Sequence, residues 1–165
     1  VSGKDVKKDI PAFDDFYLNE FDNVRELVPQ GFSLRSFFDR LKEKNYRLIL
    51  ATNPFFPINA SKTRLEWLGL STEDFEYITT MENSSYTKPN PKYYENIFDV
   101  CGLKAEECLM VGNNPIEDMC AEKLGCKVFL MPEYIENKTN VDCTDFPQGD
   151  FDDLEKFIEN LEEQK

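Results

Sequence analysis

The sequence predicts an α/β fold, a Rossmann-like parallel sheet with helices on both faces. Short apolar runs, too brief for helices, alternate along the 165 residues with segments whose apolar residues recur at helical spacing. This alternation is typical of βαβ units, in which the strands run parallel and the crossovers are right-handed. Three polar motifs lie after apolar runs. Because ligands bind at the carboxyl ends of strands in open α/β sheets, the motifs predict a functional site there.

The N-terminal part of the chain predicts three helices and one strand. Aromatic residues at helical spacing predict a helix over residues 11–24, whose aromatic face packs against another surface. The i, i+3, i+4, i+7 pattern of residues 34–41 predicts an amphipathic helix. Residues 46–52 form an apolar run that predicts a buried strand. A helix over residues 57–68 should end at Gly69 and face inward with Ile58, Leu65 and Leu68.

The rest of the chain continues the alternation. Gly102 and Gly125 each follow a helical pattern and mark helix ends. The predicted elements are a strand over 77–80, a helix over 94–101, a strand over 108–111, a helix over 116–124, a strand over 127–131 and an amphipathic helix over 154–161 with an acidic outer face.

Composition excludes several classes of function. The net charge of -13 argues against nucleic acid and anionic membranes as partners, since both would repel the chain. The absence of histidine excludes Ser-His-Asp triads and zinc sites of the Cys/His type. Five cysteines without a Cys-x-x-Cys pair fit reduced thiols in a cytoplasmic protein. No apolar run approaches the ~20 residues that span a bilayer, and no signal peptide opens the chain. The start at Val1 suggests a processed or truncated product.

The first motif, Thr52-Asn53-Pro54, ends the predicted strand over residues 46–52. A threonine hydroxyl and the amides after it can hold phosphate oxygens, helped by the N-terminus of the following helix. The alternative is a simple turn, because Asn before Pro commonly starts one. Thr52 and Asn53 are therefore candidate phosphate-binding residues.

The second motif is Lys88-Pro89-Asn90-Pro91, between a predicted strand and a predicted helix. The prolines restrict the backbone, so that Asn90 can cap the helix and Pro91 can occupy its first turn. A lysine on such a loop can screen the like charges of a phosphate and a carboxylate. An exposed lysine beside a helix cap is the alternative.

The third motif opens a predicted helix directly after the strand over residues 108–111 and contains Asn113, Asn114, Glu117 and Asp118. The oxygens of such side chains can hold Mg²⁺, together with waters. Acids in a first helical turn are also favourable without any metal, which is the alternative for Glu117 and Asp118.

The three motifs, in this order, resemble those of the haloacid dehalogenase (HAD) superfamily of phosphohydrolases across essentially the whole chain. The resemblance implies that Thr52 binds the transferring phosphoryl group and that Lys88 stabilises the phosphate and the nucleophile. It also implies that Asp118 is one of the acids that hold Mg²⁺. The expected fold is then a HAD-like core.

Two departures from that family pattern affect the expected chemistry. The family's first motif, an Asp-x-Asp at the end of the first strand, supplies the nucleophile and the general acid/base, and it has no counterpart here; Asp14-Asp15 follows no apolar strand. An amide, at Asn113 or Asn114, replaces the leading acid of the last motif. Mg²⁺ binding should therefore be weak or absent, unless Glu117 compensates.

The resemblance also predicts an incomplete sheet. The family's first strand lies centrally, between the strands predicted at 46–52 and 108–113, and its omission exposes two apolar edges. Residues 1–28 resemble the trailing helical part of a cap module, and residues 29–165 resemble an incomplete HAD-like core. We expect another polypeptide to supply the strand, or strand swapping between chains.

The leading hypothesis is a phosphohydrolase that, in its intact form, cleaves a small phosphorylated metabolite through an aspartyl-phosphate with Mg²⁺. This chain alone should be nearly inactive. The main alternative is a non-catalytic protein that binds a phosphorylated ligand or regulates on the same fold. A response-regulator receiver is disfavoured because its acidic pair precedes the other motifs, and a purely structural α/β domain is a further alternative.

Overall fold

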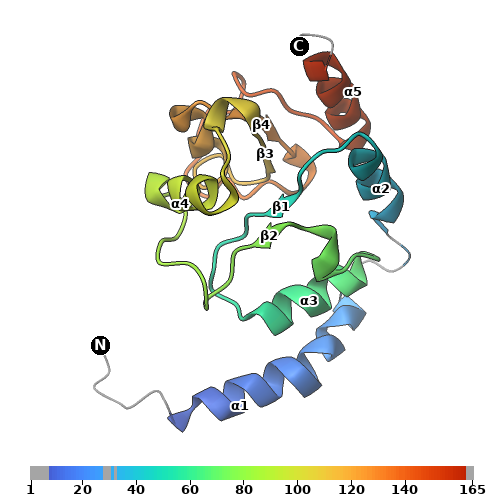
Figure 1. Ribbon diagram of the computed structural model, residues 1–165, viewed down its shortest axis with the longest axis vertical. Coiled ribbons are helices and arrows are strands. Elements are labelled where there is room, and N and C mark those ends of the chain that lie inside the picture. Colours follow the sequence, from blue (N-terminus) through green and yellow to red (C-terminus); the bar gives the residue numbers. More distant parts are fainter. Residues whose placement is uncertain (1–7, 28–30, 32, 163–165) are drawn as a thin grey trace. The chain divides into compact units, whose positions relative to one another are not determined.

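The computed structural model describes residues 8–27, 31 and 33–162. The chain divides into two compact units, residues 1–85 and 86–165. Each unit contains one two-stranded parallel sheet with its helices, β1–β2 in the first and β3–β4 in the second (Figure 1). The α/β class and the parallel strand direction predicted from the sequence are confirmed.

The first unit begins with a continuous helical segment made of α1 (Ile10–Asp15), η2 (Phe16–Glu20) and η3 (Phe21–Leu27). This segment runs along α3 (Ile58–Trp67), as Figure 1 shows. The Phe21 ring stacks on that of Trp67 with centroids 5.5 Å apart, and Tyr17 meets Phe56 edge-on. The predicted helix with a packed aromatic face is confirmed.

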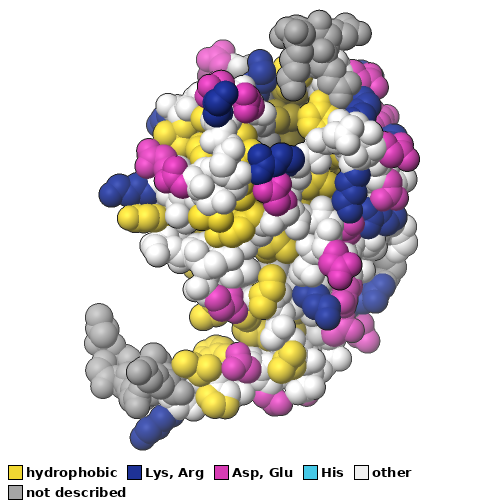
Figure 2. All heavy atoms as spheres, viewed as in Figure 1, with side chains coloured by type: hydrophobic (Ala, Val, Ile, Leu, Met, Phe, Trp, Pro, Cys, Tyr) yellow, Lys and Arg dark blue, Asp and Glu magenta, His cyan; other side chains and the backbone are white. Residues whose placement is uncertain are grey.

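The same helical segment also exposes apolar side chains. Phe13 is 62% exposed and Leu18 64%, and apolar side chains lie along α1 in the space-filling view (Figure 2). The aromatic residues therefore divide between a face that packs on α3 and one that lies open to solvent.

The sheet of the first unit pairs β1 (Ile49–Leu50) with β2 (Tyr77–Ile78). Its core consists of Leu65, Leu70 and Ile78, and α2 (Arg35–Glu43) contributes Phe38 against it. The expectation for Ile58 was wrong: it is 39% exposed. Ile58 is the first residue of α3, and the buried positions at that end of the helix are the small residues Ala60 and Ser61.

A buried carboxylate joins α2 to the short helix η4 (Thr72–Asp74). Asp74 accepts hydrogen bonds from Arg35 at 2.8 Å, from Lys42 and from the backbone N–H of Ser71 at 2.8 Å. Burial alone would raise the pKa of Asp74, but these hydrogen bonds outweigh it and hold that pKa well below its ordinary value.

The second unit pairs β3 (Leu109–Gly112) with β4 (Lys127–Leu130) along four residues. β4 is buried from Val128 to Leu130, and Leu130 also forms a parallel bridge with Gln148. The helices are α4 (Pro91–Cys101), α5 (Phe151–Glu162) and the 3₁₀ turns η5 (Ala105–Glu107), η6 (Met119–Leu124) and η7 (Pro132–Tyr134). Among the described residues, no helix is long and apolar enough to cross a membrane.

The predicted helix over residues 116–124 is wrong in type and start. A turn precedes the 3₁₀ helix η6, which begins at Met119. The Asn114 side chain accepts hydrogen bonds from the N–H groups of Ile116 and Glu117. These bonds form a local turn, and side-chain bonds of this kind compete with an α-helix.

Within the described residues, β1 and β3 each pair with a strand on one side only. The strand expected at 46–52 is present as the shorter β1, but the expectation that it is buried was wrong, because Ile49 and Leu50 are half-buried. In β3, Val111 is 36% exposed. A strand with a neighbour on one side leaves its other edge uncovered. The assignment of residues 1–28 to a cap and 29–165 to a core stays a prediction.

Candidate functional site

The second unit brings together four of the predicted site residues, which we call the lysine–aspartate site: Lys88, Asn113, Asn114 and Asp118. Its centre is an ion pair between the Lys88 ammonium and an Asp118 carboxylate oxygen, 2.5 Å apart. Both side chains are more than nine-tenths buried. Burying a charge is costly unless it is paired and hydrogen-bonded, so the pair ties these two side chains to each other.

Asp118 also organises the loop that follows β3. Its second carboxylate oxygen accepts hydrogen bonds from the backbone N–H groups of Asn113, at 3.0 Å, and Asn114, at 2.9 Å. Both carboxylate oxygens are thus engaged. A metal-binding role for Asp118 stays a prediction.

Gly112 makes this close approach possible. A Cβ atom at this position would lie 2.2 Å from the second Asp118 carboxylate oxygen. No side chain fits in that space, so the glycine at the end of β3 lets the carboxylate reach the loop backbone.

Lys88 lies on a loop whose helix cap and first helical residue were predicted from the sequence. The Lys88–Pro89 peptide bond is cis. Asn90 caps α4 by accepting a hydrogen bond from the Lys92 N–H at 3.0 Å, and Pro91 is the first helical residue, as predicted. The alternative of an exposed lysine beside a cap is wrong, because Lys88 is only 8% exposed.

Sequence reasoning missed two tyrosines beside Lys88. Tyr93 and Tyr94 are buried, and their ring centroids lie 5.7 and 5.8 Å from the Lys88 ammonium. Burial, and then the Asp118 carboxylate, raise the pKa of Tyr94 far above its ordinary value. Its hydroxyl therefore stays a proton donor. The sequence contained one signal for this contact: the two tyrosines are adjacent and lie at the start of the helix that directly follows the lysine motif.

The amide side chains of the predicted metal site make protein contacts. Asn114 uses its oxygen in the turn described above, and the Asn113 side-chain NH₂ donates to the carbonyl of Tyr134 at 2.7 Å. Both oxygens of Asp118 accept protein hydrogen bonds, and the described part of the chain holds no cluster of three acids or cysteines placed for a metal. These residues do not fit a Mg²⁺ site on their own, since Mg²⁺ takes several oxygen ligands in near-octahedral geometry.

Thr52 and Asn53 lie in the first unit, at the end of β1. The Thr79 hydroxyl donates to the Thr52 carbonyl at 2.7 Å, and the Thr52 hydroxyl lies 3.5 Å from the Thr79 carbonyl oxygen. The Asn53 carbonyl accepts the Phe55 N–H in a tight turn. Thr79, which is 1% exposed, was not predicted, although it follows directly after the β2 strand.

The N-terminus of α3 does not present all its amides to a ligand. The Ile58 N–H donates to a carboxylate oxygen of Glu82 at 3.2 Å. A carboxylate at this position would repel a phosphate, so the predicted help from the helix N-terminus is reduced.

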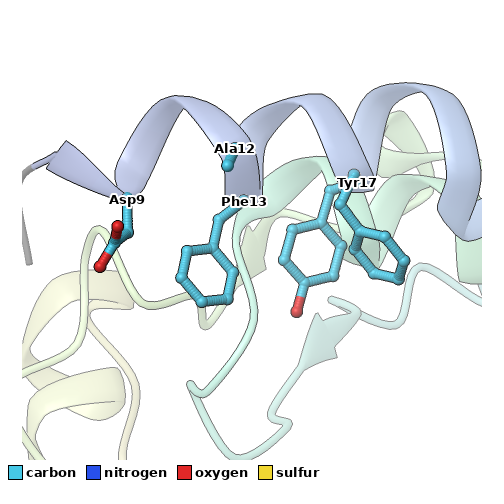
Figure 3. Close-up of a pocket in the computed structure, with 5 residues that line it drawn as sticks. Asp9, Ala12, Phe13 and Tyr17 are labelled. Atoms are coloured by element: carbon cyan, nitrogen blue, oxygen red, sulfur yellow. The ribbon is translucent and has the colours of Figure 1, made fainter.

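A hollow on the N-terminal helical segment is lined by Asp9, Ala12, Phe13, Phe16 and Tyr17, with the rings on one side of the helix (Figure 3). Its only charged side chain is a carboxylate, which does not suit an anionic ligand.

The sequence Asp150-Phe151-Asp152 is an Asp-x-Asp, but the Asp150 carboxylate accepts the Asp153 N–H at 3.0 Å and caps α5.

The chain is similar to known proteins of one hydrolase family. The family model of haloacid dehalogenase-like hydrolases matches residues 32–125, more than half of the chain. The chain is 28% identical over 108 residues to the pyrophosphatase PpaX of Bacillus cereus, an alignment that covers 64% of this chain and 48% of that protein. The chain spans about half to two thirds of the length of the pyrophosphatases it matches.

Solved structures show the same fold. A predicted phosphoglycolate phosphatase from Haemophilus somnus aligns with a TM-score of 0.61 and 22% identity, covering 76% of this chain and 55% of that one. β-Phosphoglucomutase from Clostridium difficile aligns with a TM-score of 0.59 and 13% identity, covering 86% and 60%. At these identities the likeness shows the fold and carries no statement about substrate.

Proposed function

The chain belongs to the haloacid dehalogenase-like hydrolase family, and on that premise we propose that it is the phosphate-handling part of a phosphohydrolase acting on a small phosphorylated metabolite. The observation that carries this proposal is the buried Lys88 ammonium, fixed by Asp118 beside the loop after β3. The pyrophosphatase named above supports the substrate class, since it is named for a phosphorylated compound.

In the intact reaction, an aspartate carboxylate attacks the phosphorus, the ester oxygen leaves with the electrons of the P–O bond, and water then hydrolyses the aspartyl-phosphate. In the family, that aspartate belongs to the Asp-x-Asp motif at the end of the first strand, and this sequence has no counterpart of that motif. We assign phosphate binding to Thr52, Asn53 and Lys88, with Lys88 opposing the charge of the transferring group.

We propose that the residues of this chain contribute little to binding Mg²⁺. Asn113 contributes a neutral amide in place of an acid, and the Asp118 oxygens are held by Lys88 and by backbone N–H groups. If Asn113, Asn114 and Asp118 help to hold Mg²⁺ in the intact protein, the metal would compete with these partners for the Asp118 oxygens. We therefore expect weak Mg²⁺ binding by the chain alone.

The test is phosphatase activity on p-nitrophenyl phosphate with Mg²⁺, for this chain alone and for the protein extended upstream through the next Asp-x-Asp. We expect activity only in the extended form. There, Lys88→Met should abolish most of it, whereas Lys104→Met, which removes an exposed lysine on the same unit, should not. Activity that survives Lys88→Met unchanged would contradict the assigned role.

A second candidate is a non-catalytic protein that binds a phosphorylated ligand on the same fold. The amides at Asn113 and Asn114 favour it, because they remove charge from the expected metal site. Phosphate binding without turnover, in the extended protein as well, would support this candidate. Turnover that depends on Lys88 would exclude it.

Three broader assignments accompany the proposal. Residues 1–28 are proposed as the trailing part of a cap, and residues 29–165 as the core. The open edges of β1 and β3 are proposed to associate with another strand, from the same protein or a second copy. A cytoplasmic location is proposed because five cysteines without a Cys-x-x-Cys pair fit reduced thiols.

A further inference from the structure

Lys88 lies against aromatic rings as well as beside a carboxylate. Its ammonium is 5.7 Å from the Tyr93 ring centroid and 5.8 Å from that of Tyr94, and the two rings are nearly perpendicular with centroids 5.0 Å apart. A cation within about 6 Å of a ring centroid is attracted by the ring quadrupole, most strongly where water is excluded. Tyr93 and Tyr94 are 2% and 3% exposed, so this site is desolvated.

Tyr94 touches both partners of the ion pair at once. Its ring faces the Lys88 ammonium, and its hydroxyl donates to the backbone carbonyl of Glu117 at 2.7 Å and lies 3.5 Å from that of Asp118. One rigid side chain on α4 therefore contacts the cation and the backbone that carries its carboxylate partner.

Core packing accounts for the burial of both tyrosines, since Ile97 lies at i+4 from Tyr93 and i+3 from Tyr94 and the three residues form one buried stripe of α4. It does not account for the type of side chain beside the cation. Tyr93 places a second ring beside the Lys88 ammonium, and a tyrosine ring supplies a π face that an aliphatic side chain lacks.

We propose that Tyr94 is a positioning residue that fixes the Lys88 ammonium relative to the Asp118 loop, with Tyr93 as the second wall of an aromatic bracket. The functional meaning of this bracket rests on the phosphate-binding role proposed for Lys88. The bracket itself is a property of the second unit and can be measured without substrate.

The primary experiment is NMR of the full chain, following the side-chain signals of Lys88 and the carbonyl carbon of Glu117. In the wild-type protein, the rings should displace the Lys88 Hε signals upfield from those of the exposed lysines. Tyr94→Leu should lose most of this displacement. Tyr94→Phe should keep it, because the ring remains, but should shift the Glu117 carbonyl carbon upfield, because the hydroxyl donor is gone.

Ile97→Ala is the matched control. It removes buried volume from the same helix but no ring and no hydroxyl, so it should lower the thermal midpoint while leaving the Lys88 signals in place. Equal effects of Ile97→Ala and Tyr94→Leu on Lys88, or none from Tyr94→Leu, would overturn the proposal. Should Tyr94→Leu fail to fold, Tyr93→Leu and Tyr94→Phe provide the same two readouts separately.

A titration with inorganic phosphate separates this inference from the proposed function. If the wild-type chain binds phosphate, Tyr94→Leu should weaken the affinity roughly tenfold, and Tyr94→Phe by less than about fivefold. If the wild-type chain binds none, the assigned role of Lys88 fails, whereas the NMR displacement still decides the bracket.

Discussion

At the scale of single residues, a few atoms determine the lysine–aspartate site. One Asp118 oxygen pairs with Lys88, the other takes two backbone N–H groups, and Gly112 leaves the space that this requires. A carboxylate with three hydrogen bonds is held in one position, because any rotation leaves a buried polar group unpaired.

Gly112→Ala should therefore disrupt the site strongly. The new methyl group would clash with the Asp118 carboxylate, and we expect a loss of at least about 2 kcal/mol in the free energy of unfolding. Gly102→Ala is the control: Gly102 has a φ of +61° and nothing within 4 Å of an added Cβ, so it should cost about 1 kcal/mol through backbone strain alone. Urea unfolding measures both; equal losses would argue against the close-approach explanation.

At the scale of elements, one carboxylate connects α2 to η4. Asp74 is buried and accepts hydrogen bonds from two cations that are each more than a third exposed. Its removal should cost more than the loss of an exposed ion pair, since charged hydrogen bonds to a buried group are worth about 1.5–3 kcal/mol.

Asp74→Asn should give a pH-dependent loss of stability. The folded-state pKa of Asp74 lies well below its ordinary value of 3.8, so its contribution is present above that value and is lost as the pH falls below it. The two thermal midpoints should differ most between pH 5 and 7, and the difference should begin to shrink only as the pH falls below 3.8. Asp39→Asn, which alters an exposed partner of Arg35, should change little at any pH. A constant gap across the pH range would contradict the assignment.

The contact between the N-terminal helical segment and α3 can be followed by fluorescence. Trp67 is the one tryptophan of the chain; it stacks on Phe21 and donates a hydrogen bond from its indole N–H to Asp22 at 2.7 Å. Phe21→Ala should shift its emission to longer wavelength, because water reaches the indole, and should lower the thermal midpoint. Phe13→Ala, at an exposed position, should do neither. An unchanged spectrum for Phe21→Ala would show that the helix does not cover Trp67 in solution.

At the scale of the whole molecule, the main consequence of the two short sheets is that one edge of β1 and one edge of β3 pair with no described strand. The carbonyls of Cys108, just before β3, and of Gly112, at its end, accept hydrogen bonds from the N–H groups of Lys127 and Met131. Alternate residues of a parallel strand bond to the same neighbour, so the backbone groups of Val111 face the other edge. Unpaired edges of this kind promote association.

We expect concentration-dependent association in sedimentation velocity. Val111→Pro removes an outward N–H and should reduce association while the circular dichroism spectrum is retained. Val111→Thr keeps the N–H and should still associate. A chain that sediments as a monomer at every concentration would contradict an open, reactive edge.

The sequence by itself determined the α/β class, the parallel strand direction and the positions of most elements. Periodicity and glycine stops depend on local chemistry, which is why α4 and its Asn90 cap were predictable. It also placed Lys88 and Asp118 in motifs at the ends of elements.

Only the tertiary structure decided how these residues meet. Side chains distant in sequence determined that Asp118 pairs with Lys88, that Tyr94 binds the Glu117 carbonyl and that Thr79 holds the end of β1. The predicted helix over residues 116–124 became a turn and a 3₁₀ helix because Asn114 captured its first amides. Apart from the local turn at Asn114, local propensity cannot anticipate such outcomes, since they depend on which polar groups are buried together and must therefore satisfy one another.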